Sequence, residues 1–185
     1  CKKMIKKFIH YDYRVYVFFN EMLENHQLEL KNLGCVLKPS IYKNFEIEND
    51  LNETIAFIKS IGEIEWLFID NYKIDFEWEN KIKNYVNKIF VIDDLCDKKH
   101  YCNAYLNQNF IKFQKKNLQN LFLRSTKLFL GPKYVLLDEK LSNEKPKDKT
   151  QRQKIGKVFI CFGGSDTRNF TLVTLNAIKP FLIKL

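Results

Sequence analysis

Acidic side chains follow two short apolar runs of the sequence, and these are the residues best suited to chemistry. Asp70 and Tyr72 come directly after the first run, and Asp93 and Asp94 come directly after the second. Carboxylates can accept a proton, orient a water or hold sugar hydroxyls, and a phenol can donate a hydrogen bond. The same aspartates could instead cap the helix or turn that follows each run, and the sequence leaves both interpretations open.

A strand, a helix and a second strand are predicted to position these residues. The runs 66–69 and 89–92 are short and almost wholly apolar, which is typical of parallel strands buried on both faces. Asp75 is predicted to cap the helix between them. The helix face toward the sheet is predicted to carry Trp78, Ile82 and Tyr85 or Val86. Because ligands bind at the carboxyl edge of open α/β sheets, both acidic clusters fall where a site is expected.

The rest of the chain also alternates between strand and helix patterns. Strands are predicted at 15–19, 35–37, 102–106 and 157–162, and helices at 20–33, at 51–61 and from 169 onward. Asn20 and Asp50 are the predicted N-caps of the first two helices, and Gly34 and Gly62 their C-terminal stops. This alternation predicts an α/β protein with a Rossmann-like parallel sheet.

A charged stretch divides the sequence. From Ser142 to Lys154 there is no large apolar side chain, so the stretch cannot bury itself. The predicted domains are an N-terminal Rossmann-like domain at 1–141, a linker at 142–156, and the first strand and helix of a second domain at 157–185. One strand and one helix cannot close a core, so we expect the chain to be an incomplete form.

Composition excludes few partners but favours some over others. The net charge of +9 would suit nucleic acid, yet the lysines are spread along the chain and no recognition module stands out. No apolar run reaches the length of a membrane span, and the start lacks a secretory signal. The five scattered cysteines favour reduced thiols. We therefore expect a cytoplasmic protein with no nucleic-acid or membrane partner.

Two further patterns leave alternatives open. Gly163, Gly164, Ser165 and Asp166 follow the predicted strand at 157–162 and precede a helix, which suits either an anion cradle or simply a tight turn. Cys96, His100 and Cys102 have a spacing that zinc could use, but no fourth ligand is evident. No metal site is predicted.

Taken together, four segments resemble a known family of nucleotide-sugar hydrolases. They are IDNYKIDFEWE, VIDDLCDKKHYCNAYLNQNF, LGPKYVLL and VFICFGGSDTRNFT, within residues 64–176. The family acts on UDP-2,4-diacetamido-2,4,6-trideoxy-β-L-altropyranose in pseudaminic acid biosynthesis. The resemblance implies a GT-B-type pair of Rossmann-like domains, a UDP-sugar substrate, and attack of water at the anomeric carbon with breakage of the sugar C–O bond and inversion. It implies no metal and no cofactor, and it leaves the oligomeric state open.

The resemblance also implies roles for individual residues. Asp70 and Tyr72 match the family's Asp-x-Tyr at the cleft and are the expected catalytic residues, with Asn71 in place of the more usual histidine. The expected substrate-binding residues are Asn71, Asp93, Asp94, Gln108, Asn109, Gly163, Gly164, Ser165 and Asp166. Asp97 completes the family's Asp-Asp-x-x-Asp run, and His100 matches its nearby histidine.

The general base implied by the resemblance is a histidine in a Gly-x-Gly-His-x-x-Arg-Cys motif. Cys1 matches the last residue of that motif, so the histidine is expected upstream of Cys1, and the 185 residues alone are expected to be inactive. Two other functions stay open. One is a GT-B glycosyltransferase, and the other is a non-catalytic module that binds a sugar nucleotide.

Overall fold

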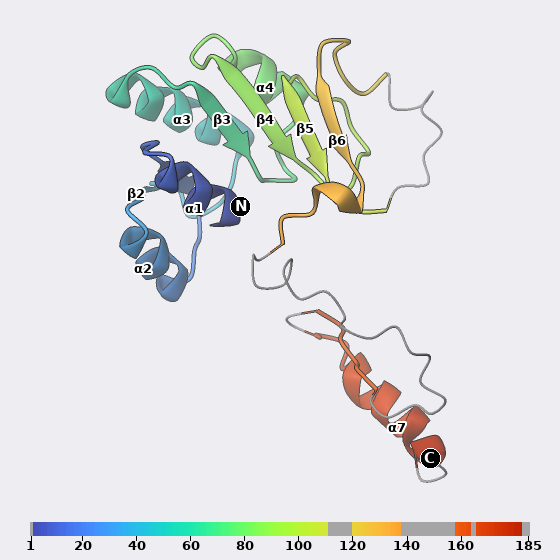
Figure 1. Ribbon diagram of the computed structural model, residues 1–185. Coiled ribbons are helices and arrows are strands. Elements are labelled where there is room, and N and C mark those ends of the chain that lie inside the picture. The colour runs from blue at the N-terminus through green and yellow to red at the C-terminus, as the bar shows by residue number, and fades with distance from the viewer. Residues whose placement is uncertain (1, 111–119, 138–157, 164–165, 183–185) are drawn as a thin grey trace. The chain divides into compact units, whose positions relative to one another are not determined.

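The computed structural model describes residues 2–110, 120–137, 158–163 and 166–182 (Figure 1). Its contacts divide the chain into two compact units, Cys1–Ser142 and Asn143–Leu185, which are described separately. The predicted linker at 142–156 and the predicted ligand residues Gly164 and Ser165 lie outside the described residues.

The first unit alternates between helices and strands. Its helices are α1 (Lys2–His10), α2 (Glu24–Asn32), α3 (Ile47–Ile61), α4 (Phe76–Ile82) and the short 3-10 helix η1 (Pro132–Tyr134). Its strands are β1 (Tyr16–Phe19), β2 (Val36–Pro39), β3 (Trp66–Ile69), β4 (Lys88–Ile92), β5 (Ala104–Asn107) and β6 (Lys127–Leu130). All the pairings between these strands are parallel, in a two-stranded sheet β1-β2 and a four-stranded sheet β3-β4-β5-β6. The predicted α/β, Rossmann-like class is therefore confirmed.

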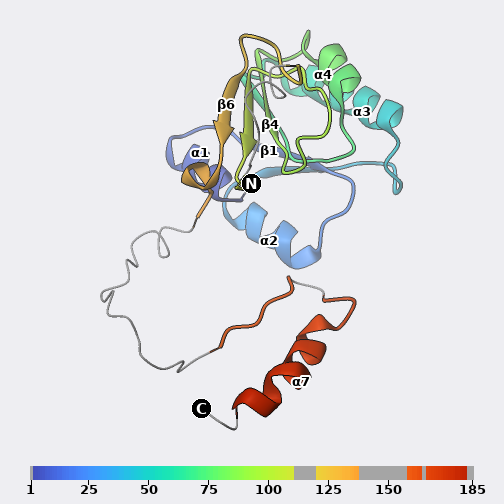
Figure 2. The ribbon, with the colours of Figure 1, turned by 90° about the vertical axis from the view of Figure 1, so that its right-hand side faces the viewer.

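Helices cover the larger sheet on opposite sides (Figure 2). The face that carries Ile69, Val91 and Tyr105 packs against α3 and α4 in one apolar cluster. The other face presents aromatic rings, and Phe8 of α1 packs on Phe68 of β3 with ring centroids 5.1 Å apart. The strands are thus held from both sides, as the uniformly apolar runs predict.

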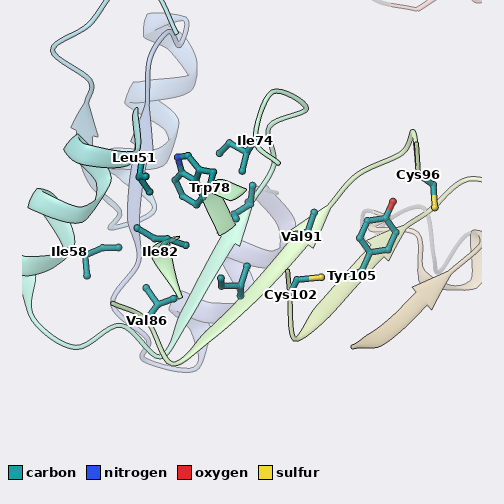
Figure 3. Packing of buried hydrophobic residues seen from close by; sticks show 12 residues of the cluster. Leu51, Ile58, Ile74, Trp78, Ile82, Val86, Val91, Cys96, Cys102 and Tyr105 are labelled. Atoms are coloured by element: carbon teal, nitrogen blue, oxygen red, sulfur yellow. The ribbon is translucent and has the colours of Figure 1, made fainter. Parts of the chain in front are cut away.

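The core lies between α3, α4 and the sheet (Figure 3). Trp78 and Ile82 are buried, as predicted; α4 ends at Ile82, and beyond it Val86 is buried whereas Tyr85 is exposed. The carboxylate of Asp75 accepts a hydrogen bond from the Trp78 backbone N–H at 3.1 Å, which confirms Asp75 as the cap of α4. Gly62, with φ of 93°, ends α3 as predicted.

Two predicted caps are wrong. Asn20 does not cap α2, which begins only at Glu24 because Leu23 adopts an extended conformation with ψ of 141°. Asp50 does not cap α3, which already begins at Ile47. The Asp50 carboxylate instead turns into the core and accepts a hydrogen bond from Trp78 Nε1 at 3.0 Å. A bond between residues distant in the sequence therefore replaces the local one that a capping box would make.

In the second unit, helix α7 (Phe170–Leu182) forms close to its predicted start. The prediction of a strand at 157–162 is wrong for its described residues, since 158–162 have no regular secondary structure. A strand needs a hydrogen-bonded neighbour, and the described part of this unit contains no second strand.

Candidate functional site

The predicted catalytic residues Asp70 and Tyr72 follow β3, and the predicted substrate-binding residues Asp93 and Asp94 follow the adjacent strand β4. Ile69 of β3 is in register with Val91 of β4, so Asp70 and the Asp93-Asp94 pair leave the sheet side by side. The Tyr72 hydroxyl donates a hydrogen bond to Asp94 Oδ2 at 3.4 Å. The structure thus brings Tyr72 and Asp94 together at the edge where the sequence places them, and Asp70 is exposed beside them.

The turn after β3 is fixed by its own polar groups. Asn71 Oδ1 accepts from the Lys73 N–H at 3.0 Å, and its backbone oxygen accepts from the Ile74 N–H at 3.2 Å. Lys98 Nζ donates to the backbone oxygens of Tyr72 and Ile74, at 2.5 and 2.6 Å. These bonds hold the turn that carries the Tyr72 ring, and they engage the Asn71 side chain within the turn.

The two oxygens of Asp94 differ in their contacts. Its Oδ1 is buried and has no hydrogen-bond partner among the residues that the structure describes. Burial raises the pKa of the neighbouring Tyr72 hydroxyl, and the charge of Asp94 raises it further. The phenol therefore keeps its proton and acts as a donor, while Asp94 offers an acceptor for a water or a hydroxyl group.

Asp93 is placed differently from its neighbour. Its side chain is buried and accepts hydrogen bonds from the Leu95 N–H at 2.9 Å, the Cys96 N–H at 3.3 Å and the Tyr105 hydroxyl at 3.2 Å. The ring of His100 lies 3.3 Å from the same carboxylate. Although burial alone would raise the pKa of Asp93, these donors lower it to about 2. Protein groups therefore already occupy the carboxylate that was predicted to bind substrate.

The amide residues after β5 also contact the protein itself. Gln108 Oε1 accepts from the Leu136 N–H at 2.7 Å, which ties the segment after η1 to the end of β5. The Asn109 N–H donates to Asn107 Oδ1 at 3.0 Å, and the Asn109 side chain is exposed. The structure places both predicted residues near the carboxyl edge of the sheet.

In the second unit, Asp166 caps the helix predicted to hold an anion. Its Oδ1 accepts from the Phe170 N–H at 2.9 Å and its Oδ2 from the Thr171 N–H at 3.0 Å. A hydrogen bond from the Thr171 side chain, together with these backbone donors, lowers the pKa of Asp166. Gly163 has a φ of 79°, a conformation that favours glycine. The first amides of α7 are thus satisfied by the chain, as the tight-turn interpretation expects.

Sequence reasoning missed several residues that build this edge. Glu79 lies in the first turn of α4 and was not predicted as a site residue, yet it is fully buried and contacts His100. The helical pattern could have predicted that Glu79 is buried, because residue 79 falls on the same apolar stripe of the sequence as Ile82 and Val86. Lys98 and Tyr105 carried no comparable signal, since their contacts join segments distant in the sequence.

The zinc alternative finds no support in this geometry. Both ring nitrogens of His100 face carboxylates. Within the described ranges no group of three or more His, Cys, Asp or Glu side chains is arranged to hold a metal ion. A surface hollow between α3 and α4 contains none of the predicted site residues; its lining includes Glu48, Asn52, Asn80, Lys81 and Tyr85.

None of the helices in the described part of the chain is long and apolar enough to cross a membrane.

A parallel sheet with flanking helices and polar side chains at its carboxyl edge defines the class of this unit, an α/β domain with a Rossmann-like sheet. No protein-family model matches the chain. It is similar to the UDP-2,4-diacetamido-2,4,6-trideoxy-beta-L-altropyranose hydrolase of Campylobacter jejuni, with 30% identity over 141 residues. The match covers 75% of this chain and 49% of that protein, so the chain spans about half the length of the relative. The resemblance stated from the sequence motifs is thereby confirmed as a resemblance.

Proposed function

We propose that this protein is a UDP-sugar hydrolase and that the carboxyl edge of β3 and β4 binds the sugar and its attacking water. The observation that carries the proposal is Asp94 Oδ1, which is buried, has no hydrogen-bond partner among the described residues and lies beside the protonated hydroxyl of Tyr72. Asp94 Oδ1 and the Tyr72 oxygen can both accept hydrogen bonds, which suits the hydroxyl and amide N–H groups of a sugar, while the Tyr72 proton is donated to Asp94 Oδ2. The similarity to a UDP-sugar hydrolase supports the same substrate class.

In the proposed reaction, a water molecule attacks the anomeric carbon and the bond from that carbon to the bridging oxygen breaks. UDP leaves with the bridging oxygen, and the attacking water becomes the hydroxyl of the free sugar with inverted configuration. Asp94 Oδ1 orients the water, and Tyr72 fixes Asp94 through its other oxygen. The proton of the water passes to a general base. His100 cannot serve as that base, because it is buried and both ring nitrogens face carboxylates.

The second unit is proposed to belong to the diphosphate side of a GT-B arrangement. UDP is a good leaving group, so dipoles that receive its growing charge would supply most of what that side contributes. The substrate is proposed to be the diacetamido trideoxy altrose nucleotide that the relative's name states. A cytoplasmic location stays a prediction from the sequence.

UDP release by the purified full-length gene product tests the proposal. We expect turnover of that nucleotide, a loss in kcat of about a hundredfold or more in Asp94→Asn, and a loss of about ten- to a hundredfold in Tyr72→Phe. Tyr85→Phe is the matched control, because Tyr85 is also a partly exposed tyrosine but lies near Lys59 and away from the strand ends. Its rate should stay within about twofold of the wild type.

Two outcomes would replace the proposal by its alternatives. Faster transfer of the sugar to an added acceptor than to water would identify a glycosyltransferase. Tight binding of the UDP-sugar by the full-length product without turnover would identify a non-catalytic module. Equal rates for the wild type, Asp94→Asn and Tyr72→Phe would contradict the assignment of the site to the edge of β3 and β4.

A further inference from the structure

A buried group of charged side chains lies beneath the candidate site and has no direct part in the proposed reaction. Glu79 comes from α4, Asp93 follows β4 and His100 precedes β5, and their side chains are at most 3% exposed. His100 Nδ1 lies 2.7 Å from Glu79 Oε1, and its Nε2 lies 3.3 Å from Asp93 Oδ2. The imidazole therefore links two carboxylates from different elements.

The two carboxyl groups joined by His100 each accept hydrogen bonds from backbone N–H groups. Glu79 Oε2 accepts from the Tyr101 N–H, and the Asp93 carboxylate accepts from the N–H groups of Leu95 and Cys96. Cys96 has a φ of 54°, a left-handed conformation that a residue with a side chain rarely adopts unless its surroundings impose it. The bonds from Asp93 thus fix the turn that begins with Asp94.

The charges in the group complement one another. Burial alone would lower the pKa of His100, but its bonds to Asp93 and Glu79 outweigh burial and raise it to about 9. The other titratable groups around it are Tyr105 and Cys96 beside Asp93, and Lys98 and Cys102 near Glu79. Burial raises the pKa values of Tyr105, Cys96 and Cys102, so these groups stay neutral. Burial also raises the pKa of Glu79, although its hydrogen bond to His100 opposes this. At neutral pH a protonated His100 therefore lies between the Asp93 carboxylate and the Glu79 side chain.

We propose that Glu79 and His100 are positioning residues for Asp94, which they hold in place through Asp93. His100 fixes the Asp93 carboxylate, Asp93 fixes the Leu95 and Cys96 peptides, and these peptides set where Asp94 points. This role in catalysis rests on the proposed function, whereas the mechanical link from His100 to the turn does not. In this proposal Asp93 supports the site and does not bind the substrate.

Glu79→Gln separates charge from geometry. A glutamine can accept from the Tyr101 N–H through its oxygen and donate to His100 Nδ1 through its amide nitrogen, and a neutral imidazole can still donate to Asp93. The turn should keep its structure, and the pKa of His100 should fall by about one unit or more because one anionic partner is lost. Glu77→Gln is the matched control, because Glu77 is an exposed acid in the same turn of α4.

His100→Gln cuts the link, because a glutamine amide can reach one of the two carboxylates but cannot bridge both. We expect hydrogen exchange at the Leu95 and Cys96 amides to become about tenfold faster, while the amides of Ile82 and Ile89 in the core keep their protection. We also expect kcat for UDP release to fall about ten- to a hundredfold while KM stays within about threefold, since a misplaced group costs rate more than binding.

These measurements separate the possible failures. Unchanged exchange at Leu95 and Cys96 in His100→Gln would overturn the positioning role. If His100→Gln does not fold, the His100 titration in Glu79→Gln decides, and an unmoved pKa would refute the link. If exchange and titration behave as expected but the full-length wild type releases no UDP, the proposed function fails and the link stands.

Discussion

Replacing Asp50 by asparagine is predicted to stabilise the first unit at neutral pH. The carboxylate lies in the first turn of α3, is buried at 5% exposure and accepts from Trp78 Nε1. Burial raises the pKa of Asp50 to about 6, although the bond from Trp78 opposes this. A folded-state pKa above the unfolded value means that Asp50 contributes stability below about pH 4, and that this contribution is lost as the pH rises through about 6.

The expected gain follows from this shift. Raising the pKa from 3.8 to about 6 corresponds to about 3 kcal/mol of stability lost on ionisation. Nearby solvent screens part of that penalty, and the N-terminus of α3 favours a negative charge by about 0.3–1 kcal/mol, so we expect Asp50→Asn to gain about 1–2 kcal/mol. The asparagine oxygen can still accept from Trp78, and its nitrogen can donate to Thr54 Oγ1, which has no partner among the described residues.

The assay is urea unfolding followed by tryptophan fluorescence, because both tryptophans, Trp66 and Trp78, lie in the first unit. Asp50→Asn should raise the unfolding free energy at pH 7.5 and have no advantage at about pH 4, where Asp50 is protonated. Glu48→Gln is the control, because it removes an exposed charge from the same helical turn. A variant less stable than the wild type at pH 7.5, or a gain that does not depend on pH, would refute the reasoning.

Three further predictions concern the same unit. Ile82→Ala should lower the unfolding free energy by about 2–5 kcal/mol in the same urea assay, because Ile82 is fully buried between α4 and the sheet. Gly62→Ala should cost about 1–3 kcal/mol, because Gly62 ends α3 at a φ of 93° and a ψ of −150°, a region that is essentially restricted to glycine; a thermal melt with no change would contradict this. The stability that the charged His100 contributes should be complete below about pH 6.5 and should be lost as the pH rises through about 9. In His100→Gln the unfolding free energy should therefore change less with pH between about 6.5 and 9 than in the wild type.

The sequence predicted the elements that local patterns specify. The runs that became β3 and β4 are short, apolar and followed by acidic residues, so both the parallel sheet and the edge with Asp70, Tyr72 and Asp94 could be inferred. Asp75 was identified as a cap because a cap bonds only its own helix. In these cases the physics that fixes the structure acts over a few residues.

The errors occurred where contacts between distant residues decide the structure. Asp50 has the spacing of a capping box, but Trp78, 28 positions away, holds its carboxylate. Glu79 looks like an ordinary helix-dipole charge until His100, 21 positions away, is placed beside it. Likewise, Asp93 and Asp94 are neighbours with the same side chain. Only the fold shows that both oxygens of Asp93 accept hydrogen bonds, whereas Asp94 Oδ1 has no partner among the described residues.

The most direct test of the central claim is hydrolysis of the UDP-sugar by the full-length gene product in water enriched in ¹⁸O. Attack at the anomeric carbon predicts that the label appears in the released sugar and not in UDP. The rate of labelling should fall by about a hundredfold or more in Asp94→Asn, because the water loses its orienting carboxylate. Label in the phosphate of UDP, or full-rate labelling of the sugar by Asp94→Asn, would contradict the account.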